Sequence, residues 1–159
     1  MTNYYCLVTG LPDLSLDDGK LNYTVANFKT ELYPQLSKED KKLIDLFYLK
    51  FDNENLLKLL KDKEAVIDAS LGNYSVDELL SVINSFKEEL PPDKKFPSYF
   101  YQFAALYLDS SEEERIGIED QLYGYYYDYA MSSSNAFVSS WYELNLNVNN
   151  ILSALSARK

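Results

Sequence analysis

Histidine is absent from this sequence, and cysteine occurs only once. The lack of histidine removes the usual general base at neutral pH and the commonest protein ligand of transition metals. Cys6 has no histidine to activate it and no second cysteine for a disulfide, and its apolar neighbours predict a small, buried side chain. Neither a GxxxxGK[ST] phosphate-binding loop nor a calcium-binding loop is present. We therefore expect a protein without enzymatic activity, cofactor or metal site.

Carboxylates are numerous, but they fall where acidic residues commonly serve structure. Asp17 and Asp18 lie in a polar stretch that predicts a turn, and the run 112–114 consists of three glutamates at a predicted helix start. Acidic side chains at such places satisfy backbone N–H groups and the helix dipole. We interpret both clusters as structural and not catalytic.

Positive charge is scarce, since 15 Lys and Arg residues face 25 Asp and Glu residues and leave a net charge of −10. Such a chain repels phosphate backbones and anionic lipid surfaces, so nucleic acid is excluded as an expected partner. No apolar run reaches transmembrane length, and the N-terminus MTNYYCLV has neither a basic leader nor a small-residue cleavage site. We expect no direct membrane insertion and a cytoplasmic location, at a membrane only through a complex.

Helical periodicity is present along most of the chain and predicts an all-α fold, a bundle of about five to seven helices in a single domain over residues 1–159. An irregular or extended lead-in over 4–14 precedes it. Helices are predicted over 25–32, 37–62, 75–90, 97–108 and 111–131, with a last helix after the spacer 132–135. Ser75 with Glu78 and Ser111 with Glu114 form predicted capping boxes. Two alternatives stay open: a break in the helix near Asp52 or Asn53, and the chain being the N-terminal part of a longer one.

The last helix has two distinct faces. Its apolar stripe, the name used below, consists of Phe137, Trp141, Leu144, Val148, Ile151, Leu152 and Leu155. Another face carries the amide row, which consists of Glu143, Asn147, Asn150 and Ala154. A solvated helix normally carries Lys and Glu on its outer face, so short amides indicate contact with other protein. A merely polar surface is the alternative interpretation.

Tyrosine is abundant, with 15 in the chain and five between positions 123 and 129. The helix over 111–131 is apolar over most of its circumference, so it is predicted to lie centrally in a bundle or to be covered by a partner. Tyr123 and Tyr127 lie on one of its apolar faces. They are candidates for a helix-packing or partner face, because tyrosine is enriched at protein interfaces.

An internal repeat is indicated when the last helix is shifted back by 95 positions onto Leu46 to Leu60. Five positions of the apolar stripe then match Leu46, Leu49, Leu56, Leu57 and Leu60. The amide row matches Tyr48, Asp52, Asn55 and Leu59, so Asn55 and Asn150 occupy the same place. This register suggests two copies of one helical unit. It also adds Asp52 and Asn55 to the candidate helix-packing or partner residues.

Three segments carry a family resemblance: YYCLVTGLPDL, DLFYLKFDNENLLKLLK and WYELNLNVNNILSALSARK. Together they resemble an uncharacterised bacterial family encoded among the genes of V-type ATP synthase subunits. More distantly, the pattern of Asp52 with Asn55-Leu56-Leu57 and that of Glu143 with Asn150-Ile151-Leu152 are similar to helix motifs in the C-type subunit of V-type and A-type ATPases, which is the d-type subunit of eukaryotic enzymes. That protein, called the funnel subunit below, has three repeats, whereas this chain has room for two at most.

The resemblance to the funnel subunit implies a function as well as an all-helical fold. The funnel subunit is built from repeated helical bundles, sits on the membrane rotor ring and receives the foot of the central shaft. The resemblance therefore implies a non-catalytic, socket-like protein whose partners are other V-type ATPase subunits, namely the central shaft and the membrane ring. The alternative hypothesis is a stand-alone acidic helical adaptor that binds another cytoplasmic protein.

Overall fold

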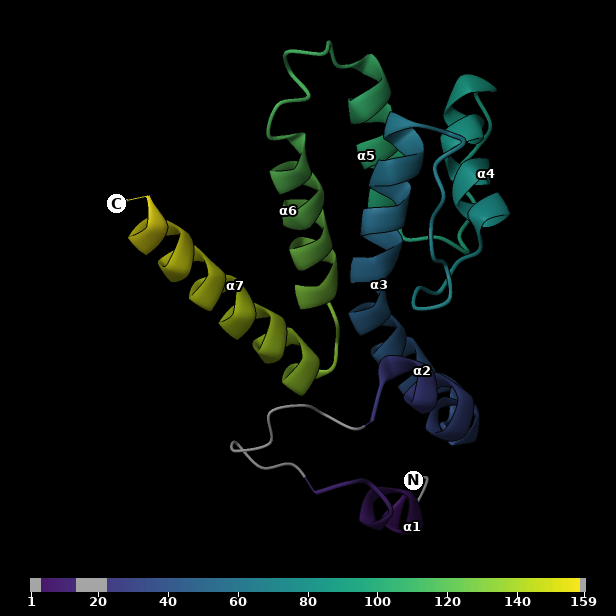
Figure 1. Ribbon diagram of the computed structural model, residues 1–159, viewed down its shortest axis with the longest axis vertical. Coiled ribbons are helices and arrows are strands. Elements are labelled where there is room, and N and C mark those ends of the chain that lie inside the picture. The colour runs from purple at the N-terminus through teal and green to yellow at the C-terminus, as the bar shows by residue number, and fades with distance from the viewer. Residues whose placement is uncertain (1–3, 14–22, 158–159) are drawn as a thin grey trace. The chain divides into compact units, whose positions relative to one another are not determined.

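The computed structural model describes residues 4–13 and 23–157 (Figure 1). Seven α-helices and no strand are assigned in this part of the chain, which confirms the predicted all-α fold. The turn predicted at Asp17 and Asp18 lies outside the described residues. The chain divides into two compact units, residues 1–45 and residues 46–159. The boundary falls inside one long helix, α3 (Lys38–Lys61).

The first unit begins with a short helix, α1 (Tyr5–Thr9), where the sequence predicted an irregular or extended lead-in. That prediction was wrong, because a short apolar run without a neighbouring strand satisfies its backbone groups best as a helical turn. The amide of Val8 bonds to the carbonyl of Tyr4 at 2.8 Å. Cys6 is exposed on this helix, so the prediction of a buried cysteine was also wrong. A helix this short leaves part of its circumference uncovered.

A hydrogen-bond cluster joins Tyr4 to the beginning of α3 within the first unit. The Tyr4 hydroxyl donates to Asp40 Oδ2 at 2.6 Å and accepts from the backbone N–H of Ser37 at 2.7 Å. Hydrogen bonds from Tyr4 and Ser37 lower the pKa of Asp40. Ser37 Oγ also accepts from the Asp40 amide at 3.1 Å, so Ser37 is the N-cap of α3.

Between these helices lies a mixed helical segment in the region predicted as one helix over 25–32. It consists of α2 (Val25–Asn27), a π-helical turn (Phe28–Leu32) and a 3-10 turn (Tyr33–Gln35). Thr24 and Asn27 form a capping box at its start. Pro34 lies inside the 3-10 turn, and the chain becomes extended at Leu36.

The second unit has its core between α3, α4 (Val76–Lys87), α5 (Ser98–Asp109) and α6 (Ile118–Met131). Its largest fully buried side chains are mostly apolar and include Leu56, Leu59, Leu79, Ile83, Phe100, Phe103 and Leu122. The predicted Ser75–Glu78 capping box is present at the start of α4, and α5 begins one residue later than predicted, directly after Pro97. α3 runs through Asp52 without a break.

Helix α6 begins at Ile118, so the prediction that it starts at Ser111 was wrong. The predicted capping contacts do exist, since the Ser111 amide donates to Glu114 Oε2 at 2.8 Å and the Glu114 amide donates to Ser111 Oγ at 3.4 Å. They close only a local turn, because Gly117 has a φ of 78° and interrupts the helical path. A left-handed residue of this kind ends or delays a helix.

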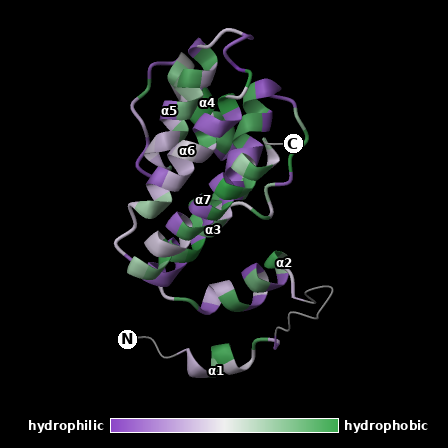
Figure 2. Ribbon diagram, turned by 90° about the vertical axis from the view of Figure 1, so that its left-hand side faces the viewer, coloured by the Kyte–Doolittle hydropathy of each residue, from purple (hydrophilic) through white to green (hydrophobic). Residues whose placement is uncertain are grey.

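Helix α7 (Ala136–Ser156) follows α6 after a short turn and is capped by Asn135, whose Oδ1 accepts from the Val138 amide at 3.1 Å. In Figure 1 it diverges from α6 toward its C-terminal end. Hydrophobic and hydrophilic residues alternate along the helices in Figure 2. In the described part of the chain no helix is long and apolar enough to span a membrane.

Candidate functional site

Helix α3 carries a row of buried polar side chains toward the loop that precedes α4. Asp52 is fully buried, and its carboxylate accepts the backbone N–H of Asn73 at 2.9 Å and that of Tyr74 at 3.1 Å. The side-chain amide of Asn73 also donates to Asp52 Oδ2, at 3.0 Å. Hydrogen bonds from several N–H groups offset the cost of burying a carboxylate. Asp52 therefore anchors a loop and is not available as a catalytic acid.

Two further residues complete this loop anchor. Asn55 is 4% exposed, and its Nδ2 donates to the backbone carbonyl of Asp68 at 3.0 Å. A Cβ atom at Gly72 would lie 2.2 Å from Asp52 Oδ1, so the close approach of loop and carboxylate requires glycine. The residues predicted as a packing or partner face, Asp52 and Asn55, thus lie inside the second unit and bind its own loop 68–74.

Asn53 is a buried residue of α3 that sequence reasoning did not single out. Its Oδ1 accepts the Tyr99 hydroxyl of α5 at 2.7 Å, while its Nδ2 is buried and has no hydrogen-bond partner. Burial raises the pKa of Tyr99 well above its ordinary value, so this hydroxyl remains a donor. The two residues are 46 positions apart, and no local pattern could have connected them.

Helix α7 packs on α6 through one face only. Val138 and Tyr142 are its buried residues, and Asn149 Nδ2 donates to the Tyr127 hydroxyl at 2.9 Å. Tyr142 also hydrogen-bonds Tyr126 through the two hydroxyls, 2.8 Å apart. At 100° per residue, Val138, Tyr142 and Asn149 lie within about 40° of one another, so the packed face is a narrow sector of the helix.

The apolar stripe of α7 lies outside this packed face and is exposed over its whole length. The exposed fractions are 71% for Phe137, 45% for Trp141, 58% for Leu144, 45% for Val148, 59% for Ile151, 56% for Leu152 and 55% for Leu155. An amphipathic helix normally turns such a stripe toward a core. A contiguous exposed apolar surface of this kind marks an interaction site.

The amide row of α7 is also exposed, at Glu143, Asn147, Asn150 and Ala154. Its counterpart in α3 is buried, with 6% exposure at Tyr48, 0% at Asp52, 4% at Asn55 and 0% at Leu59. The two rows that the sequence places in register therefore have opposite surroundings. In α3, Asp52 and Asn55 of the row bind backbone groups of a loop, whereas in α7 the row is exposed and no loop among the described residues binds to it.

The tyrosines of α6 divide between core and surface. Tyr126 is buried and donates to the backbone carbonyl of Leu46 at 3.0 Å, so the hydroxyl proton between the two tyrosines comes from Tyr142. Burial raises the pKa of Tyr126, and it raises the pKa of Tyr142 to about 12. The predicted candidates are less buried: Tyr123 is 40% exposed, and Tyr127 is half-buried against α7.

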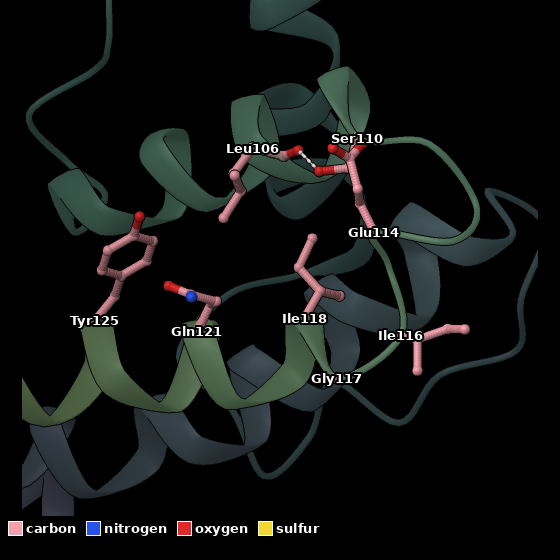
Figure 3. Close-up of a pocket in the computed structure, with 8 residues that line it drawn as sticks. All are labelled: Leu106, Ser110, Glu114, Ile116, Gly117, Ile118, Gln121 and Tyr125. Carbon is pink, nitrogen blue, oxygen red and sulfur yellow. Dashed lines mark hydrogen bonds between the residues drawn. The ribbon is translucent and has the colours of Figure 1, made fainter.

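A cavity of about 310 Å³ lies between the end of α5 and the beginning of α6 (Figure 3). Two of its polar side chains already have partners: Ser110 Oγ donates to the Leu106 carbonyl at 2.6 Å, and Glu114 accepts the N–H and hydroxyl of Ser111. These bonds lower the pKa of Glu114. Among the residues that the structure describes, no group of three or more Cys, Asp or Glu side chains could hold a metal ion. The exposed faces of α7 are therefore the stronger candidate site.

Comparison with known proteins gives one match. Residues 1–159 match the model of a family described as "Protein of unknown function (DUF2764)". No curated protein and no solved structure matches the chain. The predicted membership in a family without an assigned function is thereby confirmed over the whole length, whereas the finer resemblance to V-type ATPase subunits is not among these matches.

Proposed function

The chain belongs to the DUF2764 family, and from this premise and the two exposed faces of α7 we propose that it is a non-catalytic, protein-binding subunit of a V-type ATPase. In this proposal it resembles the funnel subunit and forms a socket between the central shaft and the membrane rotor ring. It lies on the cytoplasmic side and reaches the membrane only through the complex.

The observation that carries the proposal is the exposed amide row of α7. The matching row in α3 shows what these residues can do, since Asp52 and Asn55 bind the backbone N–H and C=O groups of loop 68–74. Asn147 and Asn150 occupy the corresponding places in α7 and offer both donors and acceptors to a partner backbone. We infer that the amide row receives a loop of a neighbouring ATPase subunit.

The distribution of titratable groups supports a role without catalysis. The chain has no histidine, and the fully buried carboxylate of Asp52 is occupied by N–H groups. The assignment to the ATPase in particular rests on the resemblance of the Asp52–Leu57 and Glu143–Leu152 patterns to the funnel subunit.

Purification of the intact V-type ATPase from cells that make this protein tests the proposal. We expect the protein to be present in the complex, and we expect the double variant Asn147→Ala, Asn150→Ala to be depleted from it. Glu113→Ala, an exposed substitution far along the chain from α7, is the matched control and remains bound. Consistent absence of the wild-type protein from an intact ATPase would refute the assignment.

The second candidate function is an acidic helical adaptor that binds another cytoplasmic protein. The same exposed amide row supports it, because a row that binds backbone groups is not restricted to one complex. Crosslinking in cells from Asn150→Cys in a Cys6→Ser background distinguishes the two functions. A captured partner from outside the ATPase, found while the ATPase lacks the protein, favours the adaptor.

A further inference from the structure

We propose that the apolar stripe of α7 binds a second copy of this chain, with the two α7 helices antiparallel and packed as a short coiled coil. The inference goes beyond the proposed function and does not depend on which complex the protein enters. It concerns the apolar stripe, whereas the proposed function concerns the amide row, whose members Asn147 and Ala154 border the stripe.

The spacing of the stripe is that of a coiled-coil core. Its residues Phe137, Trp141, Leu144, Val148, Ile151 and Leu155 follow one another at intervals of four, three, four, three and four positions. Alternation of three and four places them at the a and d positions of three successive heptads, and Leu152 lies beside them. The stripe therefore has the spacing needed to pack against a second helix from its first residue to its last.

The exposed area is sufficient for a pair of chains. From the exposed fractions of its seven residues, the stripe presents on the order of 700 Å² of accessible surface, close to the about 800 Å² that each partner buries in a standard interface. Most of that area is aliphatic and aromatic. Because α7 is already folded against α6 through Val138 and Tyr142, pairing does not require the helix to form first.

The side chains along α7 show no charge pattern that would select an oppositely charged partner over a second copy. The positions that flank the core are uncharged, namely Ser140, Asn147 and Ala154 on one side and Val138, Asn145 and Leu152 on the other. Flanking charges normally select the partner in a coiled coil. Two chains that each carry a net charge of −10 can approach along this helix, whose sole charged residue is Glu143. No basic or acidic pattern is present along α7 that would select a different chain.

The order of large and small side chains favours the antiparallel arrangement. In the antiparallel pair, a two-fold axis passes between the helices at the level of Leu146. The facing pairs, one residue from each copy, are then Phe137 with Leu155, Trp141 with Ile151 and Leu144 with Val148. Each layer then combines a larger side chain with a smaller one, whereas parallel helices would place Trp141 on Trp141. The antiparallel arrangement also brings the N-terminus of one helix dipole toward the C-terminus of the other. Asn147 of one copy faces Asn147 of the other.

The mass of the purified chain in solution tests the pairing. At concentrations well above micromolar we expect light scattering to give about twice the 18.4 kDa of one chain. Leu144→Glu places a charge in the centre of the stripe and should return the mass to that of a monomer. Ile116→Glu is the matched control, because Ile116 is 85% exposed and lies outside α7, and it should remain a dimer.

Thiol crosslinking tests the direction of the helices in a Cys6→Ser background. With a short bismaleimide reagent, Asn147→Cys should link to itself across the two-fold axis. Ala154→Cys should not link to itself but should link to Ser140→Cys when the two variants are mixed. Efficient self-linking of Ala154→Cys would indicate parallel helices and overturn the arrangement.

A monomeric wild-type chain, or a dimer that survives Leu144→Glu, would overturn the proposal that the stripe binds a second copy. Unchanged circular dichroism and melting temperature of Leu144→Glu show that the variant is folded, as expected for a side chain that is 58% exposed. Failure here is distinguishable from failure of the proposed function. A monomer that still co-purifies with the ATPase refutes only the pairing, and a dimer absent from the ATPase refutes only the assignment.

Discussion

Individual polar residues of α3 fix the position of the loop between α3 and α4, the longest connection of the second unit. Asp52 accepts N–H groups of Asn73 and Tyr74, and Asn55 donates to the Asp68 carbonyl. Buried polar groups are tolerated only when such partners are present. Gly72 makes the arrangement possible, because any side chain at that position would occupy the space of the Asp52 carboxylate.

Substitution of Gly72 tests this arrangement at the residue scale. Gly72→Ala should lower the free energy of unfolding by about 1–3 kcal/mol, because the added methyl group displaces a carboxylate that is fully buried. Gly124→Ala is the control, since a Cβ there has no atom within 4 Å. It should raise the free energy of unfolding by about 0.5–1 kcal/mol through helix propensity. Urea denaturation measures the free energy of unfolding of both variants. If Gly72→Ala and Gly124→Ala change it equally, the steric explanation is contradicted.

The buried hydroxyl of Tyr142 predicts a pH dependence. Burial raises its pKa to about 12, above the value of about 10 for an exposed tyrosine. The unfolded chain therefore loses this proton first, so the contribution of Tyr142 to stability is complete below about pH 10 and is lost as the pH rises toward 12. Tyr142→Phe should show a shallower loss of stability than the wild type between about pH 9 and about pH 12. Urea denaturation at a series of pH values measures this difference. An equal fall in the free energy of unfolding with pH in both proteins would contradict the prediction.

At the scale of elements, α3 and α7 show how one sequence pattern behaves in two surroundings. Both helices carry an apolar stripe and a polar row in the same register. In α3 two members of the row, Asp52 and Asn55, bind the loop before α4, and in α7 both the row and the stripe are exposed. The two helices therefore share a sequence pattern but not a pattern of burial. The elements that pack against each helix determine which of its faces are buried.

The matched asparagines Asn55 and Asn150 test this difference. Asn55→Ala should lower the free energy of unfolding by about 1–3 kcal/mol, because it truncates a side chain that is only 4% exposed and removes the donor to the Asp68 carbonyl. Asn150→Ala should change it by less than about 0.5 kcal/mol in the isolated protein, since Asn150 is exposed. Thermal denaturation of both variants gives the comparison. A large effect of Asn150→Ala would mean that its face is already covered.

On the scale of the whole molecule, net charge and the apolar stripe act in opposite directions. A charge of −10 makes two copies repel one another at neutral pH. Burial of the stripe favours their association and is insensitive to screening. The chain can therefore combine general repulsion with one specific, uncharged contact surface.

Salt should strengthen association for this reason. Raising the ionic strength screens the repulsion between chains of charge −10 while leaving apolar burial intact, so sedimentation velocity should show more dimer at high salt than at low salt. The Leu144→Glu variant should remain monomeric at both high and low salt. Dissociation of the wild-type dimer by salt would instead indicate an interface held by ion pairs.

Local patterns determined most of the helices. Helical periodicity placed α3, α4, α5 and α7 close to their observed bounds, and the capping box of Ser75 is present as predicted. The errors were at α1 and at the start of α6. The short apolar run of α1 is compatible with both an extended segment and a helical turn, and Gly117 allows the chain before α6 to leave the helical path. These are places where interactions between sequence neighbours are too weak to select one conformation.

The sequence by itself determined which helices form and that α7 has an apolar stripe and an amide row, because both depend on spacing along one chain. Only the tertiary structure decided which faces are covered. Asp52 meets a loop 21 residues away, Asn53 meets Tyr99 across 46 residues, and α7 finds a neighbour on one face alone. Burial depends on what packs against a helix, and that information lies in contacts between distant residues and not in the pattern of the helix itself.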